Sequence, residues 1–73
     1  MDITTQKIAN RLKEVRLQKD LTQADVARKA DINTNTYAKI ERGEQAATVK
    51  MLERIADALG IELSEVFKFK GQG

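Results

Sequence analysis

The residues best suited to binding a partner lie in the segment NTNTYAKIERG, between Asn33 and Gly43. If this segment is helical, with about 100° between successive residues, five of its side chains share one side. They are Thr34, Asn35, Ala38, Lys39 and Arg42. Asn pairs with adenine, Lys pairs with guanine, and Thr bonds to a base edge or touches a thymine methyl group. This side therefore favours hydrogen bonding in the DNA major groove, although an isolated helix with such a side is more often simply solvated.

Residues for catalysis or metal binding are scarce. The chain has no cysteine and no histidine, so it lacks the usual zinc ligands and has no base that titrates near neutral pH. Ser64 is its single serine and has no histidine to activate it. Glu53 and Asp57 are spaced as neighbours on a helix, where solvated charges are the simpler interpretation. We expect no enzyme, no metal, no cofactor and no small-molecule ligand.

The composition indicates what kind of scaffold positions the binding segment. The chain of 73 residues lacks proline and is rich in good helix formers, which predicts one all-α domain over residues 1–73. We expect its core to span about residues 5–67, with a frayed tail at 68–73. No apolar run approaches the roughly 18 residues that span a bilayer, and the N-terminus lacks a secretory signal. These features favour a cytoplasmic protein without membrane contact.

Apolar spacing and capping residues divide the chain into helices. Ile8, Leu12 and Val15 predict a first helix over about residues 5–19, and Asp20 falls where the chain must turn. Thr22, with an acid three residues later, resembles a capping box that begins a second helix of about eight residues. The inward residues of the second helix are expected to be Val26, Ala27 and Ala30.

Similar signals mark the rest of the chain. Asn33 is a favoured N-cap for the third helix, Gly43 is suited to end it, and its inward residues are Tyr37 and Ile40. Thr48 is expected to cap a fourth helix that Gly60 ends. The inward side of the fourth helix comprises Val49, Leu52, Ile55, Ala56 and Leu59, and a short fifth helix follows at 63–67.

This order of elements resembles the helix-turn-helix of the Xre/Cro-like, or phage-repressor, family. The resemblance extends from Ile8 to Phe67 and rests on LTQADVA, the IN turn, TNTYAKIERG and TVKMLERIADALGI. It implies a compact five-helix, lambda-repressor-like DNA-binding domain in which the second and third helices form the motif. Asp20 and Asp31 depart from the family, which usually has glycine there, and Glu44 places an acid where the family often contacts a phosphate.

The resemblance also assigns roles to individual residues. Base reading falls to Thr34, Asn35 and Lys39, with Ala38 small enough to permit close approach. Phosphate contacts fall to Gln23, Asn33, Thr36 and Arg42. Arg16 and Glu41 match a structural ion pair that sets the angle of the recognition helix.

The function implied by the resemblance is regulation of transcription. The family suggests a prokaryotic or phage-encoded repressor or activator that binds double-stranded DNA as a homodimer on a near-palindromic operator. Restriction-modification controllers and small phage or plasmid repressors have this size, and no sensing domain is expected after the fifth helix. The apolar Val66, Phe67 and Phe69 are candidates for the dimer interface. The alternative is that Phe67 caps the core of the domain and Phe69 lies in the frayed tail. An antitoxin-type interaction module with autoregulatory DNA binding is the alternative.

Overall fold

The computed structural model describes residues 3–69. Within this range it consists of helices joined by short turns, with no strand. The elements are α1 (Ile3–Gln18), α2 (Gln23–Ala30), α3 (Thr34–Glu41), α4 (Val49–Leu59) and the 3-10 helix η1 (Leu63–Phe67). The predicted all-α class is confirmed, although the fifth helix is a 3-10 helix rather than an α-helix. The last part of the predicted tail, residues 70–73, lies outside the described residues.

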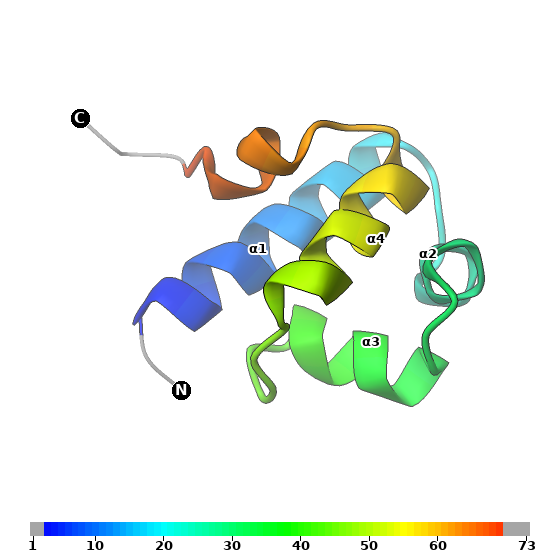
Figure 1. Cartoon of the computed structure of the whole chain (residues 1–73), viewed down its shortest axis with the longest axis horizontal. Coiled ribbons are helices and arrows are strands. Elements are labelled where there is room, and N and C mark those ends of the chain that lie inside the picture. The colour runs from blue at the N-terminus through cyan, green and yellow to red at the C-terminus, as the bar shows by residue number, and fades with distance from the viewer. Residues whose placement is uncertain (1–2, 70–73) are drawn as a thin grey trace.

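The helices surround a single core (Figure 1). Helix α2 packs against both α3 and α4, while α1 packs against α3 and η1, and η1 also packs against α4. Helix α3 lies along one side of the domain and η1 lies on the opposite side (Figure 1). This arrangement separates the helix expected to read DNA from the apolar C-terminal residues.

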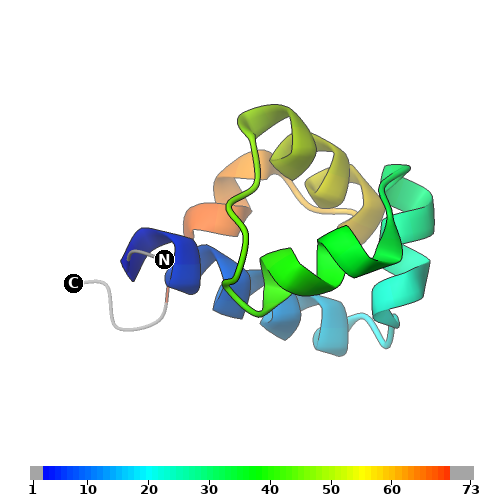
Figure 2. The same ribbon diagram turned by 90° about the horizontal axis from the view of Figure 1, so that it is seen from below.

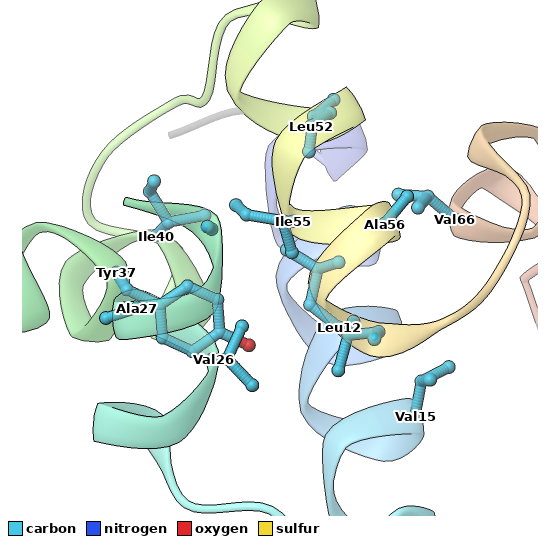
Figure 3. Close-up of a cluster of buried hydrophobic side chains, with 12 residues drawn as sticks. Leu12, Val15, Val26, Ala27, Tyr37, Ile40, Leu52, Ile55, Ala56 and Val66 are labelled. Atoms are coloured by element: carbon cyan, nitrogen blue, oxygen red, sulfur yellow. The ribbon is translucent and has the colours of Figure 1, made fainter. Parts of the chain in front are cut away.

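Every helix contributes at least one fully buried side chain to the core. Leu12, Val26, Tyr37, Ile55 and Val66 are each 0% exposed, and Figure 3 shows them meeting between the helices. Burying a side chain of this size contributes about 1.5–3 kcal/mol to stability. Because these side chains come from helices along the whole described sequence, their packing holds the domain together.

The predicted inward faces are confirmed with one exception. Val49 is expected on the side of α4 that faces the core of the domain, but its side chain is exposed. It is the first residue of α4, directly after the cap Thr48. Because helix side chains lean toward the N-terminus, that of the first residue extends beyond the part of the helix that is packed. The periodic pattern therefore overestimates the inward face by one residue.

Side-chain caps and left-handed residues set the helix ends. The capping box is present: Thr22 Oγ1 accepts from the Asp25 amide at 3.0 Å, and an Asp25 carboxylate oxygen accepts from the Thr22 amide at 2.9 Å. Gly43 and Gly60 have φ of 76° and 72°, as expected for residues that end helices. Asp20 and Asp31 both have φ of 57°, a conformation that costs a non-glycine residue some strain.

Candidate nucleic-acid interface

The outward side of α3 is open to solvent. Figure 2 looks onto α3, and no other helix lies in front of it. Thr34, Asn35 and Lys39 are all exposed, while Thr36 is half-buried. The three side chains predicted to read bases thus lie on the free side of the helix, with their hydrogen-bonding groups available to a partner.

The start of α3 is fixed by its own cap. The side-chain Oδ1 of Asn33 accepts a hydrogen bond from the Asn35 amide at 2.8 Å, while the Asn33 backbone is extended. Asn33 is therefore the N-cap, as predicted. The free amides at the first turn and the helix dipole make this end of α3 favourable for a negative charge.

Ala38 lies deeper than the helical pattern predicts. Its angular position falls between outward residues, yet it is 9% exposed and belongs to the buried set. Its methyl group is short, so longer side chains around it shield it from water even on this side of the helix. Whether Ala38 permits close approach to a partner stays a prediction.

A buried ion pair holds α3 against α1. Arg16 Nε donates to Glu41 Oε2 at 2.9 Å, and Arg16 Nη2 donates to Glu41 Oε1 at 2.7 Å. The two side chains are 10% and 2% exposed, respectively. Arg16 Nη1 also donates to the Leu21 carbonyl at 2.8 Å, so the same guanidinium fixes the loop between α1 and α2 just before the N-cap of α2. The predicted structural pair is present, with the two-pronged geometry that Arg and carboxylate favour.

Gln23 joins this network from the first residue of α2. Its Nε2 donates to Glu41 Oε1 at 3.2 Å, and its side chain is half-buried. Burial by itself would raise the pKa of Glu41, but the interactions with Arg16, Tyr37 and Gln23 together outweigh it and lower the pKa. The hydrogen bonds that Arg16 donates to Glu41 raise the pKa of Arg16. Both groups are therefore charged, and Gln23 orients α2 relative to α3.

The buried Tyr37 hydroxyl lies close to Arg16 and Glu41 of this network. Burial is the main cause that raises the pKa of this hydroxyl, while interaction with Glu41 raises this pKa further and interaction with Arg16 lowers it. No well-formed hydrogen bond reaches the buried hydroxyl from any described residue. The aromatic ring thus packs in the core, and the hydroxyl is buried near Glu41 and Arg16 without a well-formed hydrogen bond.

Arg42 is paired at the end of α3. Its Nε and Nη2 donate to Glu44 Oε2 and Oε1, each at 3.1 Å, and both side chains are about half exposed. Hydrogen bonding to Glu44 raises the pKa of Arg42, and the same contact lowers the pKa of Glu44. A predicted phosphate contact is therefore held by a neighbouring carboxylate.

Arg54 is a positioning residue that the sequence analysis missed. It lies on α4, and its Nε and Nη2 donate to the carbonyls of Ala30 at 2.9 Å and Asp31 at 2.6 Å. Its guanidinium also lies 3.4 Å from an Asp31 carboxylate oxygen. It thereby satisfies the end of α2 and secures the strained turn before α3. No local spacing signals this contact, because the partners lie 23 and 24 residues away in sequence.

The three predicted dimer residues have different surroundings. Val66 is fully buried in the core, so its assignment to a dimer surface is corrected: one subunit already covers it. Phe67 is 43% exposed. The ring of Phe69 is half-buried and lies 5.8 Å from Lys7 Nζ over α1. Phe67 is the residue of this set with apolar surface left for a second subunit.

Two further observations concern the described part of the chain. Among residues 3–69, no helix combines the length and the apolar character needed to cross a bilayer. Within the same residues, no three His, Cys, Asp or Glu side chains are grouped so that they could hold a metal ion.

Comparison with known proteins places these features in a family context. The helix-turn-helix family HTH_3 matches residues 12–66. The control protein C.MunI from a Mycoplasma species is 39% identical over 62 residues, which are 84% of this chain and 84% of that protein. The immunity repressor of Bacillus phage phi105 is 36% identical over 59 residues, and the match spans 81% of this chain but 41% of the repressor.

A solved structure supports the same grouping. The restriction-modification controller protein C.AhdI from Aeromonas hydrophila superposes with a TM-score of 0.84 at 30% sequence identity. The superposition covers 86% of this chain and 96% of that structure. The names of these relatives describe control or repressor proteins rather than enzymes.

Proposed function

We propose that this chain binds a near-palindromic operator as a homodimer with α3 in the major groove. The chain belongs to the Xre/Cro-like helix-turn-helix family of DNA-binding transcription regulators. The observation that carries the proposal is the exposed polar side of α3, whose opposite side is locked to the domain by a buried ion pair. Because such a helix is already ordered in the free protein, binding to a groove does not cost the conformational entropy of ordering it.

The roles of the side chains follow from their positions. Thr34, Asn35 and Lys39 contact base edges, because they are exposed on the outward side of α3 and carry groups that match those edges. Gln23 and Asn33 stand at the N-terminal ends of α2 and α3, where phosphates are favoured. The half-buried Thr36 and the exposed Arg42 are proposed to make further phosphate contacts.

The dimer surface is proposed to include Phe67. Its partly exposed ring lies on η1, on the side of the domain away from α3, so a two-fold contact there leaves both recognition helices free. Phe69 would adjoin this contact from its place against α1. The two half-sites should be about one turn of DNA apart. Sedimentation of wild type and Phe67→Ser tests the proposed dimer contact, since loss of the apolar ring should shift the chain from dimer toward monomer.

We infer that the regulator belongs with the restriction-modification controllers. The control protein C.MunI and the solved controller C.AhdI support this assignment, while the phi105 repressor represents the competing class. Neighbouring genes distinguish the two: an adjacent endonuclease or methyltransferase gene agrees with a controller, and a phage lysogeny region contradicts it.

The experiment on the side chains separates base reading from phosphate contact. Asn35→Ala and Lys39→Ala should each relax preference at one position per half-site, costing about 1–3 kcal/mol there. Gln23→Ala should weaken all duplexes to a similar extent. Affinities are measured by fluorescence anisotropy on the selected operator and on single-position variants of it. A uniform loss across sequences for Asn35→Ala would rule out its role as a base reader.

A further inference from the structure

Glu44 occupies a fixed position at the C-terminal end of α3. Its amide donates to the Lys39 carbonyl at 2.9 Å, and the Gly43 amide donates to the Ile40 carbonyl at 3.1 Å. Gly43 has φ of 76°, which completes a Schellman-type ending. The backbone of Glu44 is thus tied to the recognition helix rather than to a free loop, and its carboxylate stays near the cations of that helix.

Both outward cations of α3 interact with this carboxylate. Arg42 binds it through two hydrogen bonds of 3.1 Å. Hydrogen bonding to Arg42 is the main cause that lowers the pKa of Glu44, and the charge of Lys39 lowers it further. The acid therefore lies among the groups that the proposed function assigns to DNA.

A carboxylate and a phosphate are alternative partners for one guanidinium. Both present paired anionic oxygens that match the planar fork of Arg. The Arg42 side chain is about half exposed, so a DNA phosphate can reach it. Because its Nε and Nη2 already donate to Glu44, the phosphate must displace that carboxylate to bind them. After displacement, the freed carboxylate would remain close to the phosphate and repel it.

Resting on the function proposed above, we propose that Glu44 is an internal competitor for DNA phosphate that limits the affinity of the recognition helix for DNA. The competition acts on backbone contacts, which carry little sequence information. Its removal should therefore raise affinity for specific and random duplexes by the same factor and leave their ratio unchanged.

The test compares Glu44→Gln with wild type on the selected operator and on a random duplex. An exposed ion pair of this kind corresponds to a change of up to about fivefold, so we expect tighter binding by about twofold to fivefold on both duplexes. The dependence of log affinity on log salt should steepen by up to about one unit, because one more cation is free to replace counterions. Anisotropy titrations at several KCl concentrations measure both quantities.

A matched control separates this competition from a general change in charge. Glu53→Gln removes the same charge from an exposed position on α4, beside the hollow between α4 and η1. It should leave affinity nearly unchanged. An equal rise for Glu53→Gln, or no rise for Glu44→Gln while wild type still prefers its operator, overturns the inference. If wild type binds the selected operator no more tightly than the random duplex, the proposed function itself is wrong.

A double variant tests the route through Arg42. In an Arg42→Gln background, Glu44→Gln should give a much smaller gain, because the guanidinium that Glu44 holds is absent. If the full gain persists without Arg42, competition for that guanidinium is refuted. Circular dichroism melting of each variant verifies that the fold is retained.

Discussion

Replacing Glu41 by Gln tests how α3 is held in place. The substitution preserves the size of the side chain but removes the charge that Arg16 pairs with inside the domain. Glutamine offers a single carbonyl oxygen, so one of the two hydrogen bonds from the guanidinium to the carboxylate is lost as well. Arg16 stays charged, because its guanidinium does not deprotonate in proteins.

The magnitude follows from the burial of the pair. Breaking a buried ion pair by removing one partner costs about 3–5 kcal/mol. We expect the lower end, about 3 kcal/mol, because Arg16 keeps 10% exposure and a further hydrogen bond to the Leu21 carbonyl. For a domain of this size each kcal/mol corresponds to about 4–8 °C in melting temperature. Glu41→Gln should therefore lower the melting temperature by more than about 10 °C.

Urea and thermal unfolding followed by circular dichroism measure the loss. The matched control is Arg28→Gln, which breaks the ion pair of Arg28 with Asp25, where the side chains are 71% and 32% exposed. An exposed pair contributes about 0–1 kcal/mol, so the control should change little. Replacing Arg16 by Met and Glu41 by Leu together should recover stability, because no charge is then left buried alone.

A loss of stability below about 1 kcal/mol for Glu41→Gln, equal to that of the exposed control, would mean that the buried pair does not hold α3 in place. In that case the contact between Arg16 and Glu41 would be incidental, and the orientation of α3 would have to come from its apolar side alone.

Three further predictions concern stability. Asp31→Gly should stabilise the domain by about 0.5–1 kcal/mol in urea unfolding, because Asp31 has a left-handed backbone and Arg54 holds its carbonyl, which glycine retains; a loss would contradict the strain. Tyr37→Phe should be neutral or stabilising by up to about 1 kcal/mol, since no well-formed hydrogen bond reaches the buried hydroxyl; a marked loss would mean that its contact with Glu41 or Arg16 is a stabilising hydrogen bond. The lowered pKa of Glu41 means that its contribution is full above its unfolded pKa of about 4.3 and is lost as the pH falls through the folded value. The difference in melting temperature between wild type and Glu41→Gln should therefore narrow from pH 6 toward pH 3, and a constant difference would contradict it.

Local signals in the sequence predicted the helix ends well. Thr22, Asn33 and Thr48 cap their helices, and Gly43 and Gly60 end theirs, because capping depends on residues only a few positions apart. The family resemblance predicted from these segments is confirmed by the match over residues 12–66. Periodicity also identified most of the core, since each helix had a clear apolar side.

Properties that depend on distant contacts were harder to predict. Val66 had the same apolar character as Phe67, and the packing of η1 against α1 and α4 decides that Val66 is buried and Phe67 half-exposed. Arg54 could not be identified as the residue that secures the turn before α3, because nothing near it in sequence indicates that α4 passes the end of α2. Whether Thr34, Asn35 and Lys39 read bases stays a prediction.

The most direct test of the central claim is the affinity of the wild-type chain for a duplex selected from a random pool, relative to a scrambled duplex at physiological salt. We expect selection to enrich a near-palindromic sequence with half-sites about one turn apart, bound at least about 1,000-fold more tightly than the scrambled duplex. A ratio near one, with binding that depends on salt but not on sequence, would contradict it.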